Sequence, residues 1–270
     1  MATKKTKAPQ SALSQKAMLV SVNISQWTGR RVDKRATDTA NVAHKANENA
    51  GKYHKKLLPN AVELEAIGTI ASQARKYFYE QTLPWMADGS RIINGKNYLN
   101  FVSKMRAFKV EFENAVKDFE KAYPRLKSEA VKTLGDLFDK DEYPDDIASK
   151  FNIESTFLPL PDVGDFRTEI TDAEKKQFIA KMRDVEGDAM RDCWSRLHSV
   201  VKTAADKLSQ PDAIFRDSLL ENVTEIVNLL PMLNITDDKN LEKQRLDIKK
   251  LISNLDTFDL REDTVARASL

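Results

Sequence analysis

One long apolar stripe, between residues 97 and 138, constrains the fold of this chain more than any other feature of its sequence. Apolar side chains recur there at steps of three or four, which places them on one face of a helix of about seven turns. Charged residues of both signs fill the other positions, as on a solvated helix face. The stripe consists of Leu99, Val102, Met105, Phe108, Phe112, Ala115, Val116, Phe119 and Tyr123. A helix this long, with aromatic residues on its stripe, must pack against other long helices.

Two stretches alternate with a period of two and are predicted to be strands. Residues 18–27 place Val20, Val22 and Ile24 on one face, and residues 152–161 alternate in the same way. A single strand is not stable by itself, so we expect the two strands to pair with each other in a small two-stranded sheet.

The rest of the chain is predominantly helical in pattern. Predicted helices span residues 34–57, 61–81, 125–138, 145–151, 171–208, 214–231 and 237–255. Thr171 and Glu174 form a capping box at the start of the longest of these. Pro124 is expected to stop or kink a helix, and the helix that begins at residue 214 is expected to end near Pro231. The predicted fold is therefore mostly α, an elongated bundle of long antiparallel helices with a small two-stranded β-sheet.

Composition agrees with one helical domain. Hydrophobic residues make up 41% of the 270 positions and charged residues 31%, with 8 glycines and 9 prolines. We expect a disordered basic tail over residues 1–16, a single helical domain over 17–260 with a sub-division near residue 165, and a frayed end over 261–270. No apolar run approaches 18 residues, so no membrane contact is expected. A single cysteine, Cys193, is typical of a reducing cytoplasm.

Positive charge is concentrated near the N-terminus. Residues 1–56 contain 12 lysines and arginines against 3 acidic residues, a net charge of +9, whereas the remaining chain carries 31 against 38, a net charge of −7. Such a split suits a nucleic-acid contact or head-to-tail self-association. The residues most suited to nucleic acid or an acidic partner are Trp27, Arg30, Arg31, Lys34 and Arg35. The alternative is that Trp27 anchors the core and the basic side chains are merely solvated.

Sequence patterns of catalysis are missing. The chain has no phosphate-binding loop, no dinucleotide fingerprint and no His-Glu-x-x-His motif. Cys193 and His198 stand five apart on one predicted helix, which turns them away from each other, so a buried structural cysteine is expected instead. His44 and His54 lack a third metal ligand, and the acidic residues at helix starts are explained by capping. We therefore expect no catalytic residues, no metal and no cofactor.

Aromatic residues are clustered on both sides of Pro84. Tyr77, Tyr79 and Trp85 are candidates for a protein interface, although the sequence leaves open whether this cluster is core or surface.

Five runs of the sequence resemble an uncharacterised family encoded by bacteriophages and integrative mobile elements. They are residues 24–30, 79–85, 157–162, 190–198 and 211–219. Members of this family are often encoded near MoxR-like AAA+ ATPases and phage-type recombination genes. The resemblance implies a place in the cytoplasm of a bacterial host cell and implies no activity.

Two functions are expected from these observations. The first is a non-enzymatic phage or mobile-element protein that self-assembles or binds a protein partner, for example a MoxR-like AAA+ ATPase. The alternative is a DNA-binding protein that uses its basic N-terminal segment in phage replication or recombination.

Overall fold

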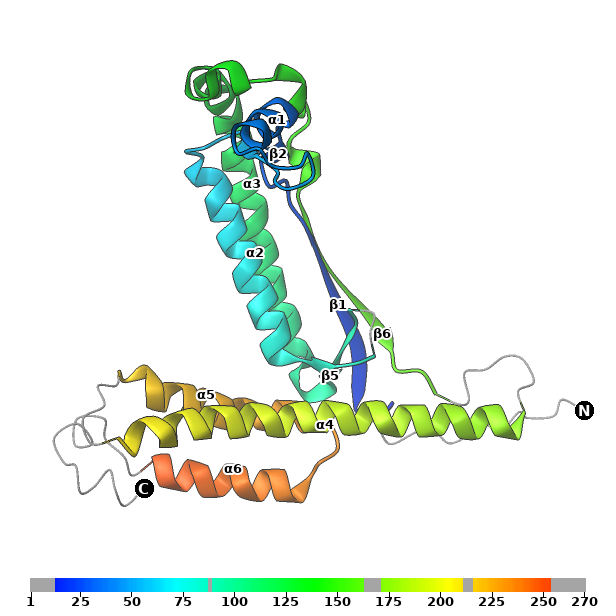
Figure 1. The fold of residues 1–270 in the computed structure, drawn as a ribbon. Helices are drawn as coiled ribbons and strands as arrows, with labels where there is room; N and C mark the ends of the chain where they lie inside the picture. The colour runs from blue at the N-terminus through cyan, green and yellow to red at the C-terminus, as the bar shows by residue number, and fades with distance from the viewer. Residues whose placement is uncertain (1–12, 87–88, 163–170, 211–215, 254–270) are drawn as a thin grey trace, which may run out of the picture. The chain divides into compact units, whose positions relative to one another are not determined.

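A computed structural model of the protein describes residues 13–86, 89–162, 171–210 and 216–253, and all structural statements below refer to these residues. The α-helices are α1 (Lys34–Ala43), α2 (Val62–Gln81), α3 (Tyr98–Leu134), α4 (Asp172–Leu208), α5 (Ser218–Leu233) and α6 (Lys239–Ile252). The strands are β1 (Ala17–Ser25), β2 (Arg30–Val32), β3 (His54–Lys56), β4 (Leu83–Pro84), β5 (Arg91–Asn94) and β6 (Asn152–Pro159). Short 3₁₀ helices are η1 (Gly95–Asn97), η2 (Gly135–Leu137), η3 (Lys140–Glu142) and η4 (Ala148–Lys150). The mostly α fold class is confirmed (Figure 1).

The chain divides into two compact units, and four elements pass from one to the other. Unit 1 comprises the described parts of residues 1–21, 77–102 and 156–270, and unit 2 comprises residues 22–76 and 103–155. The predicted sub-division near residue 165 falls within residues 163–170, which lie outside the described residues.

The sheet is larger than the sequence predicted. β1 and β6 are hydrogen-bonded neighbours, as expected, but they belong to a four-stranded sheet in the order β4-β5-β1-β6. β1 pairs antiparallel with β5 from Ala17 opposite Asn94 to Val20 opposite Arg91, and Leu83 of β4 pairs with Ile92. β4 and β5 are too short to give an alternating pattern, which is why the sequence did not predict them. A second sheet of two strands, β2 and β3, was not predicted at all.

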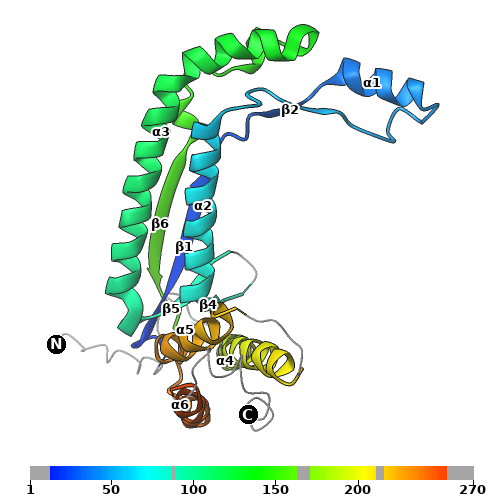
Figure 2. The same ribbon diagram turned by 90° about the vertical axis from the view of Figure 1, so that its left-hand side faces the viewer.

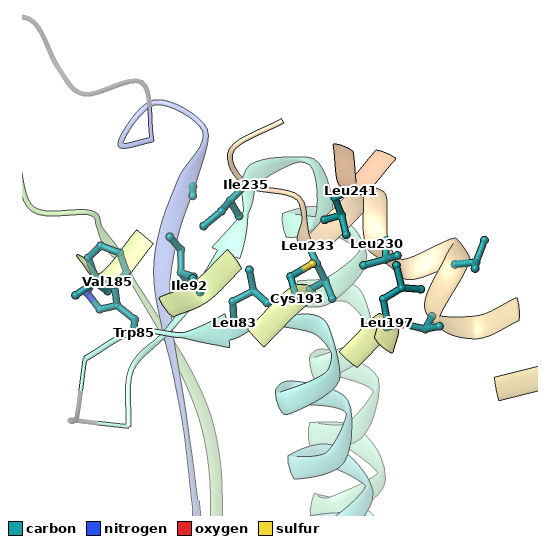
Figure 3. Close-up of a cluster of buried hydrophobic side chains, with 14 of the residues drawn as sticks. Leu83, Trp85, Ile92, Val185, Cys193, Leu197, Leu230, Leu233, Ile235 and Leu241 are labelled. Carbon is teal, nitrogen blue, oxygen red and sulfur yellow. The ribbon is translucent and has the colours of Figure 1, made fainter. Parts of the chain in front are cut away.

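Unit 1 is built around the apolar stripe of α4. Val185, Ala189, Cys193 and Leu197 are buried and pack against the apolar face of α5 and against the strands β4 and β5 (Figure 3). α4, α5 and α6 run antiparallel to one another in succession, as predicted for the long helices (Figure 1). The elongated shape expected for the whole chain stays a prediction.

Unit 2 is built around the middle of α3, which lies beside α2 (Figure 2). Met105, Phe112, Phe119 and Tyr123 are buried, as their spacing predicts. Phe151, which follows η4, packs edge-on against Phe112 and Phe119, with ring centroids 6.4 and 5.7 Å apart. The core of this unit is therefore rich in aromatic rings.

One predicted helix is much shorter than expected, and two helices continue through a proline. The helix expected over residues 34–57 ends at Ala43, because Lys45 adopts a left-handed backbone (φ 51°) and the chain then returns as β3. α3 continues through Pro124 to Leu134 and bends in its C-terminal part (Figure 2), so of the two expected effects of this proline the helix shows a kink and not a stop. α5 likewise continues through Pro231.

The ends of the chain lie mostly outside the described residues. Of the expected tail over residues 1–16, residues 13–16 form a turn in which Lys16 and Ala17 donate backbone hydrogen bonds to the carbonyl of Leu13. The frayed end expected over residues 261–270 falls outside the described part of the chain. No described helix is long and apolar enough to cross a bilayer.

Candidate functional site

The second sheet, a short antiparallel ribbon, carries two of the four predicted basic residues, Arg30 and Arg31. Arg30 pairs with Lys56, Arg31 with Lys55 and Val32 with His54. Two further backbone hydrogen bonds extend this ladder, from Leu57 N to Gly29 O (2.7 Å) and from Asp33 N to Tyr53 O (2.9 Å). A ribbon of three residues per strand is marginal alone, so other contacts must hold it in place.

Lys55 provides that anchor from a buried position. Its side chain is 3% exposed, and its Nζ donates to Asp33 Oδ2 (2.9 Å) and to the backbone oxygen of Leu137 (2.7 Å). It also forms an ion pair with Glu142 Oε2, at 2.9 Å. The buried ammonium group therefore has two hydrogen-bond acceptors and a second carboxylate beside it. Burial lowers the pKa of Lys55, but its contacts with Glu142 and Asp33 outweigh burial and raise the pKa overall. The ribbon is thus tied to η3 through Glu142 and to the last residue of η2, Leu137.

Asp33 also begins α1. Its Oδ1 accepts the backbone N–H of Ala36 at 2.9 Å, in the manner of an N-cap. This hydrogen bond and the one from Lys55 lower the pKa of Asp33. Asp33 and Lys55 are therefore held as an ion pair by structural contacts, and neither is available to a ligand.

The alternation of the strands divides the ribbon into two faces. Residues directly opposite each other share a face, so Arg31 lies on the same face as Lys55, towards Glu142. The other face, here called the basic face, consists of Arg30, Val32, His54 and Lys56, all of them exposed. Arg30 and Lys56 stand directly opposite each other, although like charges at such positions destabilise a sheet. An anion bound at the basic face would relieve this repulsion.

A groove of about 370 Å³ adjoins the basic face and brings Trp27 together with Arg30 and Lys56. Its apolar lining includes Leu58 and Leu64. We call it the Trp27 groove, and its complete lining is Gln26, Trp27, Thr28, Gly29, Arg30, Lys56, Leu58, Pro59, Ala61, Leu64, Glu65 and Gly68.

The remaining predicted basic residues lie at the start of α1. Lys34 and Arg35 are exposed, and Arg35 donates to the backbone oxygen of Asp136 at 3.3 Å. Residues 28–58 present seven exposed lysines and arginines against two exposed acidic residues, Asp38 and Glu48. The structure thus gathers Trp27 and Arg30 in one groove and places Arg31, Lys34 and Arg35 outside it. Trp27 proves to be both half-buried against the core and part of a surface groove.

Three residues of this site could not be found from the sequence. His54, Lys55 and Lys56 were assigned to a helix, in which they would face three directions. Their pairing with β2 puts His54 and Lys56 on the basic face. A three-residue strand carries no periodic signal that would have revealed this.

The three residues predicted to form a protein interface differ in how far they are buried. Trp85 is 4% exposed and belongs to the core of unit 1 (Figure 3). Tyr77 is half-buried and stacks on Phe101 with a centroid distance of 5.7 Å. Tyr79 is 55% exposed and lies under the guanidinium of Arg91, 4.9 Å from its ring centre.

Other candidate chemistry occupies structural positions. Cys193 is fully buried, as expected, and burial raises its pKa to about 12. His44 and His198 are both exposed, on α1's C-cap and on α4 respectively. Asp238 caps α6 and accepts the indole N–H of Trp194 at 3.2 Å. Within the described ranges, no three His, Cys, Asp or Glu side chains gather in a way that could hold a metal ion.

Comparisons with known proteins return no match: no family model, no curated protein and no solved structure matches this chain. The fold and the site define a mostly α protein that presents a basic β-ribbon beside an aromatic groove.

Proposed function

We propose that this chain is a non-enzymatic nucleic-acid-binding protein that uses the basic face of the β2–β3 ribbon. The observation that carries the proposal is the pairing of Arg30 directly opposite Lys56 beside the Trp27 groove. Two cations held side by side match the spacing of charge along a phosphate backbone, and an adjacent aromatic side chain suits a base. Ribbons of two strands are an established means of contacting DNA.

The distribution of charge around the ribbon supports the same function. The acidic segment that includes Glu142 contacts the ribbon on the Lys55 face, not on the basic face. Exposed basic side chains on β2, β3 and α1 outnumber the exposed acidic ones around them. A polyanion approaching the basic face therefore meets a predominantly positive surface.

The test is a salt titration of binding to a fluorescein-labelled 30-base-pair DNA duplex, measured by fluorescence anisotropy. Each lost phosphate contact lowers the slope of log K against log salt by about 0.9, so the double variant Arg30→Ala/Lys56→Ala should lose about 1.8 from the slope and bind more weakly. The matched control is Arg106→Ala/Lys117→Ala, which removes the same charge from exposed positions of α3. Wild-type protein that fails to bind at low salt, or two double variants that behave alike, would refute the proposal.

A second proposed function is binding of a protein partner or a second copy of the chain, and a groove in unit 1 supports it. The groove has a volume of about 290 Å³ and a lining that includes Trp85, Leu160, Phe178, Ile179 and Met182. Ile179 is 39% exposed, so one side of α4 presents apolar surface next to this groove. A MoxR-like AAA+ ATPase is the partner that the family resemblance suggests.

Mass measurement in solution, together with co-purification with such an ATPase, tests this second function. Ile179→Asp should abolish the association, whereas Gln177→Asp, at an exposed position turned away from it on the same helix, should leave it intact. A strictly monomeric chain with no partner would count against this function.

A further inference from the structure

The Trp27 groove differs from a flat basic surface in having a rigid aromatic wall. The indole of Trp27 packs against Phe119 and Tyr123, with ring centroids 6.3 and 6.2 Å away. Both partners are buried residues of α3. The indole is therefore fixed from the core side, while its other side lines the groove. A fixed aromatic surface can stack a flat ligand at little entropic cost.

Glycine at position 29 keeps the groove open beside this wall. Gly29 has a left-handed backbone (φ 61°), which side chains disfavour. A Cβ atom added there would lie 3.1 Å from Leu64 Cδ2 and 3.3 Å from Trp27 Cζ3. The space between the indole and Leu64 therefore exists because residue 29 has no side chain.

The distribution of charge indicates which part of a nucleic acid enters the groove. Arg30 and Lys56 of the basic face line the groove on one side. Glu65, in the first turn of α2, adds a carboxylate to the same lining. A phosphate placed against Glu65 would be repelled. A neutral base fits there instead, because Glu65 and Gln26 can accept hydrogen bonds from base amino groups. The volume of about 370 Å³ lies in the range of about 300–1,000 Å³ that is usual for small-molecule sites.

We propose that the Trp27 groove binds an unstacked base of a single-stranded nucleic acid, with neighbouring phosphates on Arg30 and Lys56. This inference rests on the proposed nucleic-acid-binding function and specifies its ligand. In a duplex the faces of the bases are covered by their neighbours, and only their edges are accessible in the grooves of the helix. A site that stacks a base face therefore selects single strands.

The test compares the single strand of a labelled 20-mer DNA with the blunt duplex of the same sequence, using full-length protein at fixed salt. Gly68 lines the groove from the middle of α2, and a Cβ atom there meets nothing within 4 Å. Gly68→Leu should consequently fold normally, which circular dichroism verifies, and fill the groove. Ala66→Leu adds the same side chain at an exposed position on the opposite side of α2 and is the control.

We expect wild-type protein to bind the single strand at least tenfold more tightly than the duplex. Gly68→Leu should weaken single-strand binding by about 5- to 150-fold, the range for loss of one stacked base, and leave duplex binding unchanged. The single strand should also quench tryptophan fluorescence in the wild type and not in Trp27→Phe, because Trp85 is buried and Trp194 lies on α4 in unit 1.

Three outcomes would overturn the inference. Equal affinity of Gly68→Leu and wild type for the single strand would show that the groove holds no base. Equal affinity of wild type for both DNA forms would show that it does not select single strands. Displacement of the single strand by poly-glutamate at equal charge concentration would assign the site to acidic protein segments. If binding depends on Arg30 and Lys56 but not on Gly68, only this inference fails, whereas absence of binding to either DNA form removes the proposed function as well.

Discussion

Replacing Lys55 by methionine should destabilise the protein more than any other single change to the β2–β3 ribbon. Lys55→Met keeps most of the aliphatic packing but removes the ammonium from its three oxygen partners. Asp33 Oδ1 retains its hydrogen bond from Ala36. Asp33 Oδ2 and the carbonyl of Leu137 lose their donor, and Glu142 loses its ion-pair partner. The change therefore isolates the buried charge contacts from the packing.

The magnitude follows from the burial of these groups. Removing one partner of a fully buried ion pair costs about 3–5 kcal/mol because it leaves an uncompensated charge. Asp33 is 6% exposed, but the side chain of Glu142 is 21% exposed and can recruit water. We therefore expect the lower end of the range, about 3 kcal/mol, which is roughly a hundredfold decrease in the folding equilibrium constant.

The assay is urea denaturation followed by circular dichroism, combined with hydrogen exchange at the amides of Asp33 and Leu57, which close the ladder. Lys56→Met, on the exposed face of the same strand, is the control and should stay within about 0.5 kcal/mol of wild type. Adding Glu142→Leu to Lys55→Met should cost less than the sum of the two single changes, because the double variant leaves one charge fewer unpaired. If Lys55→Met and Lys56→Met unfold alike, the ribbon is not held by this ammonium.

Three further predictions concern pH, thiol reactivity and the aromatic core. Since the pKa of Asp33 is lowered and that of Lys55 is raised in the folded protein, the stability from this pair should be constant between about pH 5 and about pH 10. It should fall as the pH drops through the pKa of Asp33 or rises through that of Lys55, and Lys55→Met should lack the alkaline decrease in urea titrations across this range. Cys193, with a pKa raised to about 12 by burial, should react with a disulfide reagent at pH 8 about a thousandfold more slowly in native than in denatured protein; comparable rates would contradict its burial. Phe112→Ala, at a side chain that is 1% exposed, should cost about 3–5 kcal/mol in urea denaturation, and a cost below about 1 kcal/mol would mean that the aromatic core is loosely packed.

The two proposed functions use different units of the protein and can be separated experimentally. The basic face and the Trp27 groove belong to unit 2, and the groove that includes Trp85 and Ile179 belongs to unit 1. Ile179→Asp should leave DNA binding unchanged, and Gly68→Leu should leave partner binding unchanged. A protein that binds both ligands would connect nucleic acid to a protein partner.

The sequence by itself determined the long helices and one strand pairing. A spacing of three to four residues predicted the buried stripe from Met105 to Tyr123, and the capping box at Thr171 marked the start of α4. These features are local, because the period of a helix and its capping residues lie within a few turns of one sequence segment. The pairing of β1 with β6 was predicted because neither alternating strand is stable alone. The start of the stripe was predicted less well: Leu99, expected on the buried face, is 77% exposed, whereas Phe101 is buried. The segments that pack against a helix decide where its buried face begins.

Only the tertiary structure decided the candidate site. β3 exists because it pairs with β2, and Lys55 is buried because Asp33, Leu137 and Glu142, which lie 22, 82 and 87 positions away, converge on it. The Trp27 groove likewise joins residues from β2, β3 and α2. Contacts between distant segments leave no periodic pattern in the sequence, so the basic residues could be identified in advance but their arrangement could not. The physical reason is that pairing and burial depend on which segments meet, and a local sequence pattern does not contain that information.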